Sequence, residues 1–216
     1  GHAMAEVLEK VMRPKDEYRG MVSATGSAGT IASGDYMKQL FPSSKIVASE
    51  ALQCPTLLEN GFGAHRIEGI GDKHVPWIHN VKNTDIVVAI DDNAVVNLAR
   101  LFNEPAGQAY LLRKGVPQQI VSSLHLLGFS GISNVLSAIK FGKYYEMGEN
   151  DIVLTVLTDS MELYGSRLQE MRQEFGVYHE TDAAEHFARY LQGESTDHMI
   201  ELTYADRRRV HNLKYF

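Results

Sequence analysis

Short apolar runs and longer amphipathic stretches follow one another along this chain of 216 residues. Short runs rich in β-branched residues predict strands, and apolar positions recurring every three or four residues predict helices. We expect strands at 20–25, 45–50, 84–90 and 151–157, and helices at about 5–13, 30–40, 92–102, 130–144, 162–175, 182–192 and 204–214, with two more between 105 and 127.

The first two predicted strands are joined by a helix, and such a crossover implies parallel strands. The run 151–157 is apolar enough to be buried on both faces, as strands of parallel sheets are. The pattern therefore predicts an α/β fold: an open, mostly parallel sheet with flanking helices and a helical C-terminal tail.

Neither end of the chain carries a clear start or stop signal. Residues 1–4 (Gly-His-Ala-Met) look like a cloning remnant, and the helix 5–13 begins without a cap. We therefore expect a fragment of a longer protein, with a partial domain over 5–160 and a helical extension over 161–216.

Composition excludes several classes of function. The net charge of -6 and the lack of a basic stripe argue against nucleic-acid binding. No apolar run is long enough to cross a bilayer. The single cysteine, Cys54, excludes an internal disulfide and indicates a reducing compartment, so we expect a cytoplasmic protein.

A glycine-containing loop, Gly26-Ser27-Ala28-Gly29-Thr30, follows the first strand and precedes a helix. Backbone N–H groups are unpaired at a helix N-terminus, and small residues let an anion approach them. The loop is therefore a candidate phosphate site, and the alternative is a tight turn between strand and helix.

Two familiar phosphate motifs fit this loop poorly. A Walker loop needs Lys after its last glycine, where this chain has Thr30. The glycines at 26, 29 and 34 do not match a dinucleotide fingerprint, although Glu50 ends the next strand where a ribose-binding acid would lie. A third pattern, 128–132, resembles a hydrolase elbow but has Ile132 in place of its last glycine, so Ser130 is better interpreted as a helix N-cap or a ligand contact.

Three further segments follow the glycine loop in order: 65–76 (His-Arg-Ile-Glu-Gly-Ile-Gly, then Val-Pro), 128–140 (Gly-Phe-Ser-Gly-Ile-Ser-Asn onward) and 157–164 (Leu-Thr-Asp-Ser-Met-Glu-Leu-Tyr). With the loop, they resemble the cysteine synthase and tryptophan synthase β-like family of fold-type II pyridoxal-phosphate (PLP) enzymes. The resemblance covers about residues 20–165.

The resemblance implies a role for each matching position. Ser130 would meet the pyridine nitrogen, and a neutral partner there suits elimination or replacement at Cβ. Asp159 and Ser160 match a loop near the pyridine edge, and Tyr164 closes that motif. The resemblance places the PLP phosphate on Gly26, Ser27, Ala28, Gly29 and Thr30, and the substrate beside Gly69, Ile70 and Gly71.

The chain also departs from the family pattern. Ala28 replaces a glycine, which is tolerable if its φ angle is negative. Residues 72–74 replace small residues, which leaves the substrate open, and Gly131 with Ile132 replaces Ser-Gly. Met161 and Leu163 replace Gly and Arg, and about twenty extra residues lie between 101 and 127.

The family's Schiff-base lysine motif and its loop for the substrate carboxylate are absent. The ten lysines are expected at the surface. We therefore expect a C-terminal fragment of a PLP-dependent lyase or synthase acting on a small amino acid, inactive alone and homo-oligomeric. The alternatives are a non-catalytic subunit that supplies the phosphate cradle to a partner chain, and a Rossmann-type nucleotide-binding domain.

The remaining candidates have plainer interpretations. No metal site is expected, because the spacing of His74 and His79 around Pro76 does not suit one. We expect loop polarity for these two, surface roles for His179 and His186, a core position for His125, a buried Cys54, and a solvated helix face or interface for Arg207–Arg209.

Overall fold

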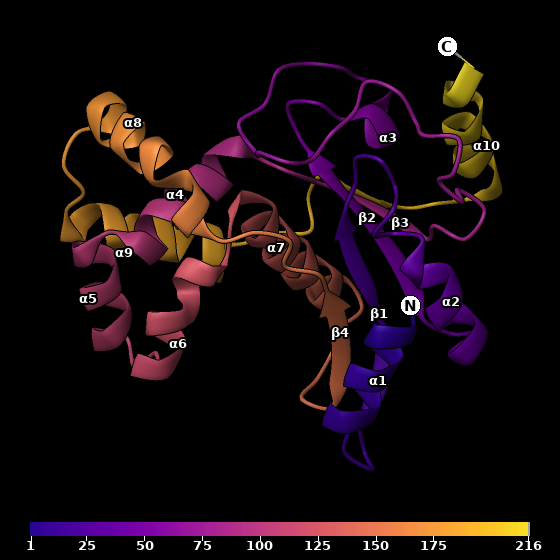
Figure 1. Ribbon diagram of the computed structural model, residues 1–216, viewed down its shortest axis with the longest axis horizontal. Helices are drawn as coiled ribbons and strands as arrows, with labels where there is room; N and C mark the ends of the chain where they lie inside the picture. Colours follow the sequence, from indigo (N-terminus) through magenta and orange to yellow (C-terminus); the bar gives the residue numbers. More distant parts are fainter. Residues whose placement is uncertain (216) are drawn as a thin grey trace.

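The computed structural model describes residues 1–215. A five-stranded sheet lies between helices, with the strand order β4-β1-β2-β3-β5 (Figure 1). The first four strands are parallel, and β5 pairs antiparallel with β3. The strands are β1 (Glu17–Ala24), β2 (Lys45–Ala51), β3 (Ile86–Ile90), β4 (Asp151–Thr155) and β5 (Met199–Glu201).

Most predicted helices are present, with shifts of a few residues at their ends. The helices are α1 (His2–Val11), α2 (Ser33–Leu40), α3 (Thr56–Glu59), α4 (Asp92–Asn103), α5 (Pro105–Arg113), α6 (Gln118–Ser123), α7 (Phe129–Tyr144), α8 (Gly165–Phe175), α9 (Glu180–Phe187) and α10 (Tyr204–Asn212), with short helical turns η1 (Leu124–Leu126), η2 (Met161–Tyr164), η3 (Ala188–Gln192) and η4 (Leu213–Tyr215). Asp91 caps α4 by accepting the N–H of Asn93.

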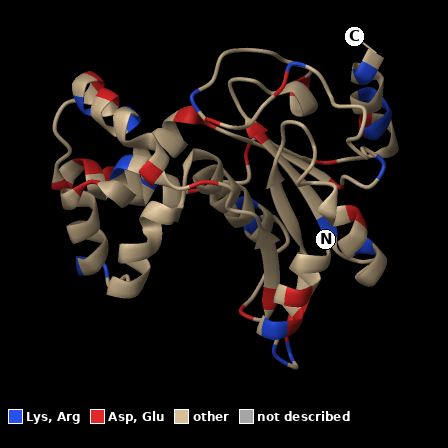
Figure 2. Ribbon diagram, in the orientation of Figure 1, with Lys and Arg blue, Asp and Glu red and all other residues tan. Residues whose placement is uncertain are grey.

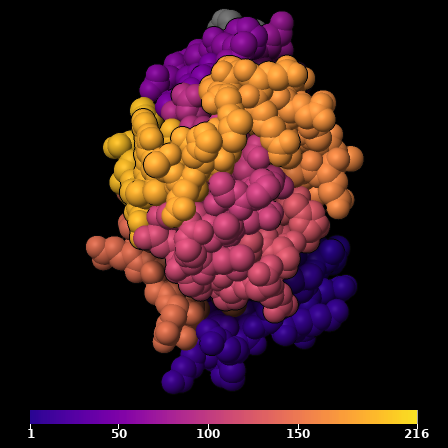
Figure 3. Space-filling model, turned by 90° about the vertical axis from the view of Figure 1, so that its left-hand side faces the viewer, coloured from indigo at the N-terminus to yellow at the C-terminus, as the bar shows by residue number. Residues whose placement is uncertain are grey.

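The sheet has an apolar core on each face because side chains alternate along a strand. Val47 points into the larger core beneath α7 and α4, whereas its neighbour Ile46 points into the smaller core that α10 closes. The helices α4, α5, α6, α8 and α9 form a group beside the sheet, and Figure 3 views the molecule from that side.

The strand β4 differs from its prediction. Its residues are all partly exposed because β4 lies at the edge of the sheet and pairs only with β1. The expectation of burial on both faces was wrong, since an apolar run does not reveal how many neighbours a strand has. The strand β5 was not predicted, because three residues within a polar tail give little periodic signal.

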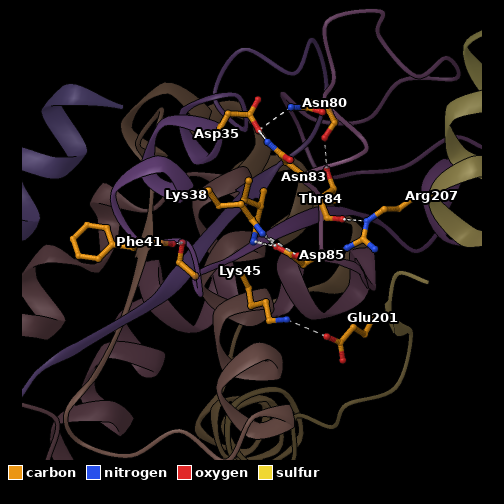
Figure 4. Close-up of polar contacts among 12 residues, drawn as sticks. Asp35, Lys38, Phe41, Lys45, Asn80, Asn83, Thr84, Asp85, Glu201 and Arg207 are labelled. Atoms are coloured by element: carbon orange, nitrogen blue, oxygen red, sulfur yellow. Dashed lines mark hydrogen bonds and ion pairs between the residues drawn. The ribbon is translucent and has the colours of Figure 1, made fainter. Parts of the chain in front are cut away.

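The tail returns to the sheet through a polar cluster at the amino ends of β2 and β3 (Figure 4). The Asp85 carboxylate accepts from Lys38 Nζ at 2.8 Å and from the backbone N–H of Ile46 at 2.8 Å, and Arg207 Nη2 lies 3.4 Å away. Arg207 lies on α10, and Figure 2 shows basic residues in blue on that helix. At least one of the tail arginines is therefore a structural contact rather than a solvated charge.

Several single-residue expectations need correction. His125 is only partly buried, with Nδ1 2.8 Å from the carbonyl of Ser122, so the predicted core position was wrong. His79 is buried against Thr84, so it is not loop polarity. Lys140 is also buried, 2.7 Å from a carboxylate oxygen of Glu194, which contradicts the surface position expected of lysines.

Two other expectations have clear outcomes. Cys54 is buried, as predicted. His186 is partly buried beside Tyr178, so the predicted surface role holds only for His179, which is exposed at the start of α9. None of the helices in residues 1–215 is long and apolar enough to span a membrane.

Candidate functional site

The strand order places a crevice at the carboxyl ends of β1 and β4. From β1 the chain proceeds to β2 on one side, whereas β4 lies on the other side. Ligands of open α/β sheets bind where the strand order reverses in this way. A pocket lies at this point, lined by Ser23, Ala24, Gly26, Ser27, Ala28, Gly29, Thr30, Gly69, Ile70, Ser130, Asn134, Val156 and Thr158.

The pocket brings together eight of the nine residues that the resemblance assigned to cofactor or substrate. They come from three segments that lie far apart in the sequence. Gly71 is the exception, because it lines a neighbouring small cavity instead.

The glycine loop offers unpaired donors to this pocket. None of the six backbone N–H groups from Gly26 to Ile31 donates a hydrogen bond within the described residues. The helix α2 begins only at Ser33, three residues later than expected, so these donors belong to the loop itself. A Cβ added to Gly26 would meet no atom within 4 Å, so the space beside Gly26 is open. This arrangement suits an anion.

The backbone of Ala28 does not meet the condition under which an alanine suits this loop. Its φ angle is +64°, in the left-handed region, so the negative φ that would make alanine tolerable there is not present. Successive N–H groups that pass through a left-handed residue form a concave anion-binding surface, which supplies a physical reason for this conformation. An alanine there costs roughly 1–2 kcal/mol relative to a right-handed conformation.

The segment 69–71, which includes the lining residues Gly69 and Ile70, is held by backbone hydrogen bonds. The Gly71 N–H donates to the Thr25 carbonyl at 2.7 Å. The Thr25 N–H in turn donates to the carbonyl of Ser49 in β2 at 2.8 Å. The φ angles of Gly69 and Gly71 are +78° and +84°, which glycine tolerates readily. A Cβ on Gly71 would lie 2.5 Å from Nε2 of His65, so two independent constraints favour glycine at this position.

Ser130 is buried in the first turn of α7, and Gly128, not Ser130, is the N-cap. Its hydroxyl lies 3.1 Å from the Thr158 hydroxyl and 3.3 Å from Oδ1 of Asp159. The Tyr164 hydroxyl donates to the other oxygen of Asp159. Asp159 therefore contacts Ser130, Tyr164 contacts Asp159, and neither of the two lines the pocket.

Asn134 lines the pocket, although the motif 128–140 that contains it assigned it no role. It is buried in α7 and contacts both β1 and the segment after β4. The only available signal was its position, one helical turn after Ser130, which places both side chains on the same face of a helix.

Glu50 does not act as a ribose-binding acid here. Its carboxylate is buried and accepts the backbone N–H groups of Leu57 and Leu58 at 2.9 and 2.8 Å. Burial raises the pKa of Glu50 to about 7, against those two hydrogen bonds and the nearby Arg209 charge. Because both oxygens are occupied by α3, this feature of the nucleotide-binding alternative is lost.

The pocket contains no lysine, and the ten lysines of the chain all lie elsewhere. Among the described residues no group of three or more His, Cys, Asp and Glu side chains could hold a metal ion. The pocket therefore brings no amine of its own.

Comparisons with known proteins give a consistent result. No family model matches the chain. Cysteine synthase B of Campylobacter jejuni is 26% identical over 164 residues, which cover 76% of this chain and 48% of that protein. The cysteine synthase of Staphylococcus aureus is 24% identical over 144 residues, 66% of this chain and 40% of that protein. The chain spans about half the length of the curated relatives it matches.

Solved structures agree on the fold. A hydrogen sulfide-producing enzyme of Fusobacterium nucleatum matches with a TM-score of 0.60 and 23% identity, over 84% of this chain and 48% of that one. The cysteine synthase of Entamoeba histolytica matches with a TM-score of 0.64 and 20% identity, over 88% and 49%. The homologues of this chain are therefore cysteine synthases, which are PLP-dependent enzymes, and its fold is that of fold-type II enzymes of this kind.

Proposed function

We propose that this chain holds the cofactor phosphate of a PLP-dependent enzyme that catalyses β-elimination or β-replacement on a small amino acid. The observation that carries the proposal is the pocket at the carboxyl ends of β1 and β4. There the loop 26–30, whose N–H groups donate to no protein atom of the described residues, lines the same pocket as Gly69, Ile70 and Ser130. The homologous cysteine synthases support PLP as the ligand.

The residues present fit one half of the cofactor. The open space at Gly26 and the unpaired N–H groups suit a phosphate. Ser130 would lie beside the ring nitrogen, and Gly69 and Ile70 would border the substrate. When bound, PLP supplies the electron sink for chemistry at the amino-acid Cα and Cβ.

The amine for a Schiff base must come from elsewhere, because no lysine lines the pocket. The buried Lys140 is committed to Glu194 and to the carbonyls of Ser195 and Asp197. We propose that the lysine belongs to an N-terminal region or to a partner subunit, and that the chain alone is inactive. Residues 5–160 would be the cofactor-binding part and 161–216 an extension, in a cytoplasmic homo-oligomer.

The phosphate site can be tested with ligands that lack an aldehyde and so cannot react with surface lysines. Calorimetric titration should detect binding of pyridoxine 5′-phosphate and not of pyridoxine. The variant Gly26→Ala should fold normally, since an added Cβ meets no neighbour, and should weaken this binding because the methyl group adds bulk to the pocket lining. The matched control is Gly142→Ala, whose Cβ also meets no neighbour but which lies on α7 away from the pocket.

The absence of a lysine has its own test. Addition of PLP should give no visible absorbance band that is abolished by replacing one particular lysine. A band that disappears with a single lysine variant would show that this chain supplies the amine, and would refute the need for a second polypeptide. A thermal shift with NAD but not with pyridoxine 5′-phosphate would instead favour nucleotide binding.

A further inference from the structure

The pairing of β1 changes near the pocket. On one side β1 stays paired with β2 as far as Ala24, which lies opposite Ser49. On the other side its pairing with β4 ends earlier, at Val22 opposite Thr155. Beyond that point the two strands separate, and the pocket lies in the gap.

The side chain of Asn134 fills the place of the next ladder hydrogen bond. Its Oδ1 accepts the backbone N–H of Ala24 at 2.7 Å, and its Nδ2 donates to the carbonyl of Val156 at 3.1 Å. The amide thus satisfies one backbone group of each strand while keeping the strands apart. Because Asn134 is only 3% exposed, loss of these bonds would leave polar groups unpaired near the core.

We propose that Asn134 is the positioning residue that holds β1 and the segment after β4 apart and thereby forms the anion pocket. The inference rests on the proposed phosphate-binding role of the pocket. Ala24 directly precedes the loop segment 25–30, and Val156 lies two residues before Thr158, so the bridge sets the distance between two walls of the pocket. A side chain with both an acceptor and a donor is needed, and it must be short enough to fit between two backbones.

The experiment uses sulfate as the probe, because sulfate does not titrate between pH 5 and pH 8. The dissociation constant of each variant is divided by that of the unaltered chain at the same pH. Asn134→Ala removes both hydrogen bonds and should weaken sulfate binding roughly tenfold at every pH, as expected for the loss of buried hydrogen bonds. Asn134→Asp should bind weakly at pH 8, where its carboxylate can accept from Ala24 but cannot donate to Val156.

The aspartate variant also provides a rescue. A protonated carboxyl has the shape of the amide and offers both an acceptor and a donor, and burial raises the pKa of such a group. Sulfate affinity of Asn134→Asp should therefore recover toward that of the unaltered chain as the pH falls to 5, whereas Asn134→Ala should show no recovery. A carboxylate in the pocket lining also repels sulfate at pH 8, so the discriminating result is that Asn134→Asp at pH 5 binds sulfate more tightly than the uncharged Asn134→Ala does.

The control for general destabilisation is Val95→Ala in α4, a buried truncation outside the pocket. It should lower the unfolding temperature and leave the sulfate dissociation constant unchanged. Unchanged affinity in Asn134→Ala, an equal loss in Val95→Ala, or no recovery of Asn134→Asp at pH 5 would each overturn the proposal.

A second measurement separates this inference from the proposed function. Hydrogen exchange of the Ala24 amide reports the bridge without any ligand, and Asn134→Ala should exchange this amide at least tenfold faster relative to the Met21 amide in the same strand. If the unaltered chain binds no sulfate, the proposed function fails and the exchange result alone decides the bridge. Unchanged protection of Ala24 would refute the bridge itself.

Discussion

The buried carboxyl of Glu50 should make stability depend on pH in an unusual direction. Glu50 is 2% exposed, and burial raises its pKa from an ordinary 4.5 to about 7. Between these two values the unfolded chain has released the proton while the folded chain retains it. Its contribution to stability is therefore fully present below pH 4.5 and is lost as the pH rises through 7.

The size of the effect follows from the shift. A difference of one pKa unit corresponds to 1.36 kcal/mol, so the shift of Glu50 corresponds to about 3 kcal/mol in the free energy of unfolding. The variant Glu50→Gln cannot titrate, and it still offers one acceptor to the N–H groups of Leu57 and Leu58. Loss of the second acceptor should destabilise it by an amount that does not change with pH.

The assay is urea unfolding at half-unit steps from pH 4.5 to pH 8. The stability of the unaltered chain minus that of Glu50→Gln should fall by about 3 kcal/mol across this range. The control is Glu59→Gln, the same substitution at an exposed acid at the end of the same helix. A flat difference for Glu50→Gln would show that the carboxyl is ionised in the folded chain at pH 5 and would refute the reasoning.

The remaining predictions concern other buried groups. Burial lowers the pKa of His79 from 6.5 to about 4, so its contribution to stability is present above pH 6.5 and is lost as the pH falls through 4. The variant His79→Gln should abolish this loss of stability at acid pH, which urea unfolding between pH 4 and pH 7 would measure. Lys140→Met should destabilise the chain by about 3 kcal/mol because it leaves the Glu194 carboxylate unpaired, and the double variant with Glu194→Gln should recover much of the lost stability. Equal stability of the single and double variants would contradict the pairing. Ala28→Gly should change stability by less than about 1 kcal/mol because relief of the left-handed conformation offsets the lost methyl burial, whereas Ala28→Val should destabilise the chain by about 2 kcal/mol or more. Similar melting temperatures for the two variants would argue against a φ angle of +64° at this position.

The Glu50 and His79 effects act in opposite directions over nearly the same pH range. Both side chains line the small cavity that Gly71 also lines. Between pH 4.5 and pH 6.5 the two slopes should largely cancel in the unaltered chain, so each single variant should display the slope of the group that remains. A steep profile in the unaltered chain over this range would contradict the cancellation.

Local sequence patterns predicted most elements of this fold because those patterns are strong. The apolar run of β3 and the amphipathic pattern of α4 are local features, and the structure confirms both elements. The exposed edge at β4 and the return of β5 to the sheet depend on neighbours distant in the sequence. Residue types within one segment carry no information about such pairing.

The site shows the same division. The glycine loop, Gly69 and Ser130 were identified from motifs, and the structure places them in one pocket. Asn134 was missed because its importance lies in the backbone groups of Ala24 and Val156, which any residue type would present. The left-handed Ala28 was missed because alanine rarely adopts that conformation.

The central claim is that the free N–H groups of residues 26–31 bind a phosphate. The most direct test is a titration followed by ¹H–¹⁵N NMR, with pyridoxine 5′-phosphate and pyridoxine compared on the same sample. The phosphate ester should shift the amide resonances of 26–31 first and most, and pyridoxine at the same concentration should leave them unchanged. Equal shifts with both ligands, or shifts confined to other parts of the chain, would contradict a phosphate site at this loop.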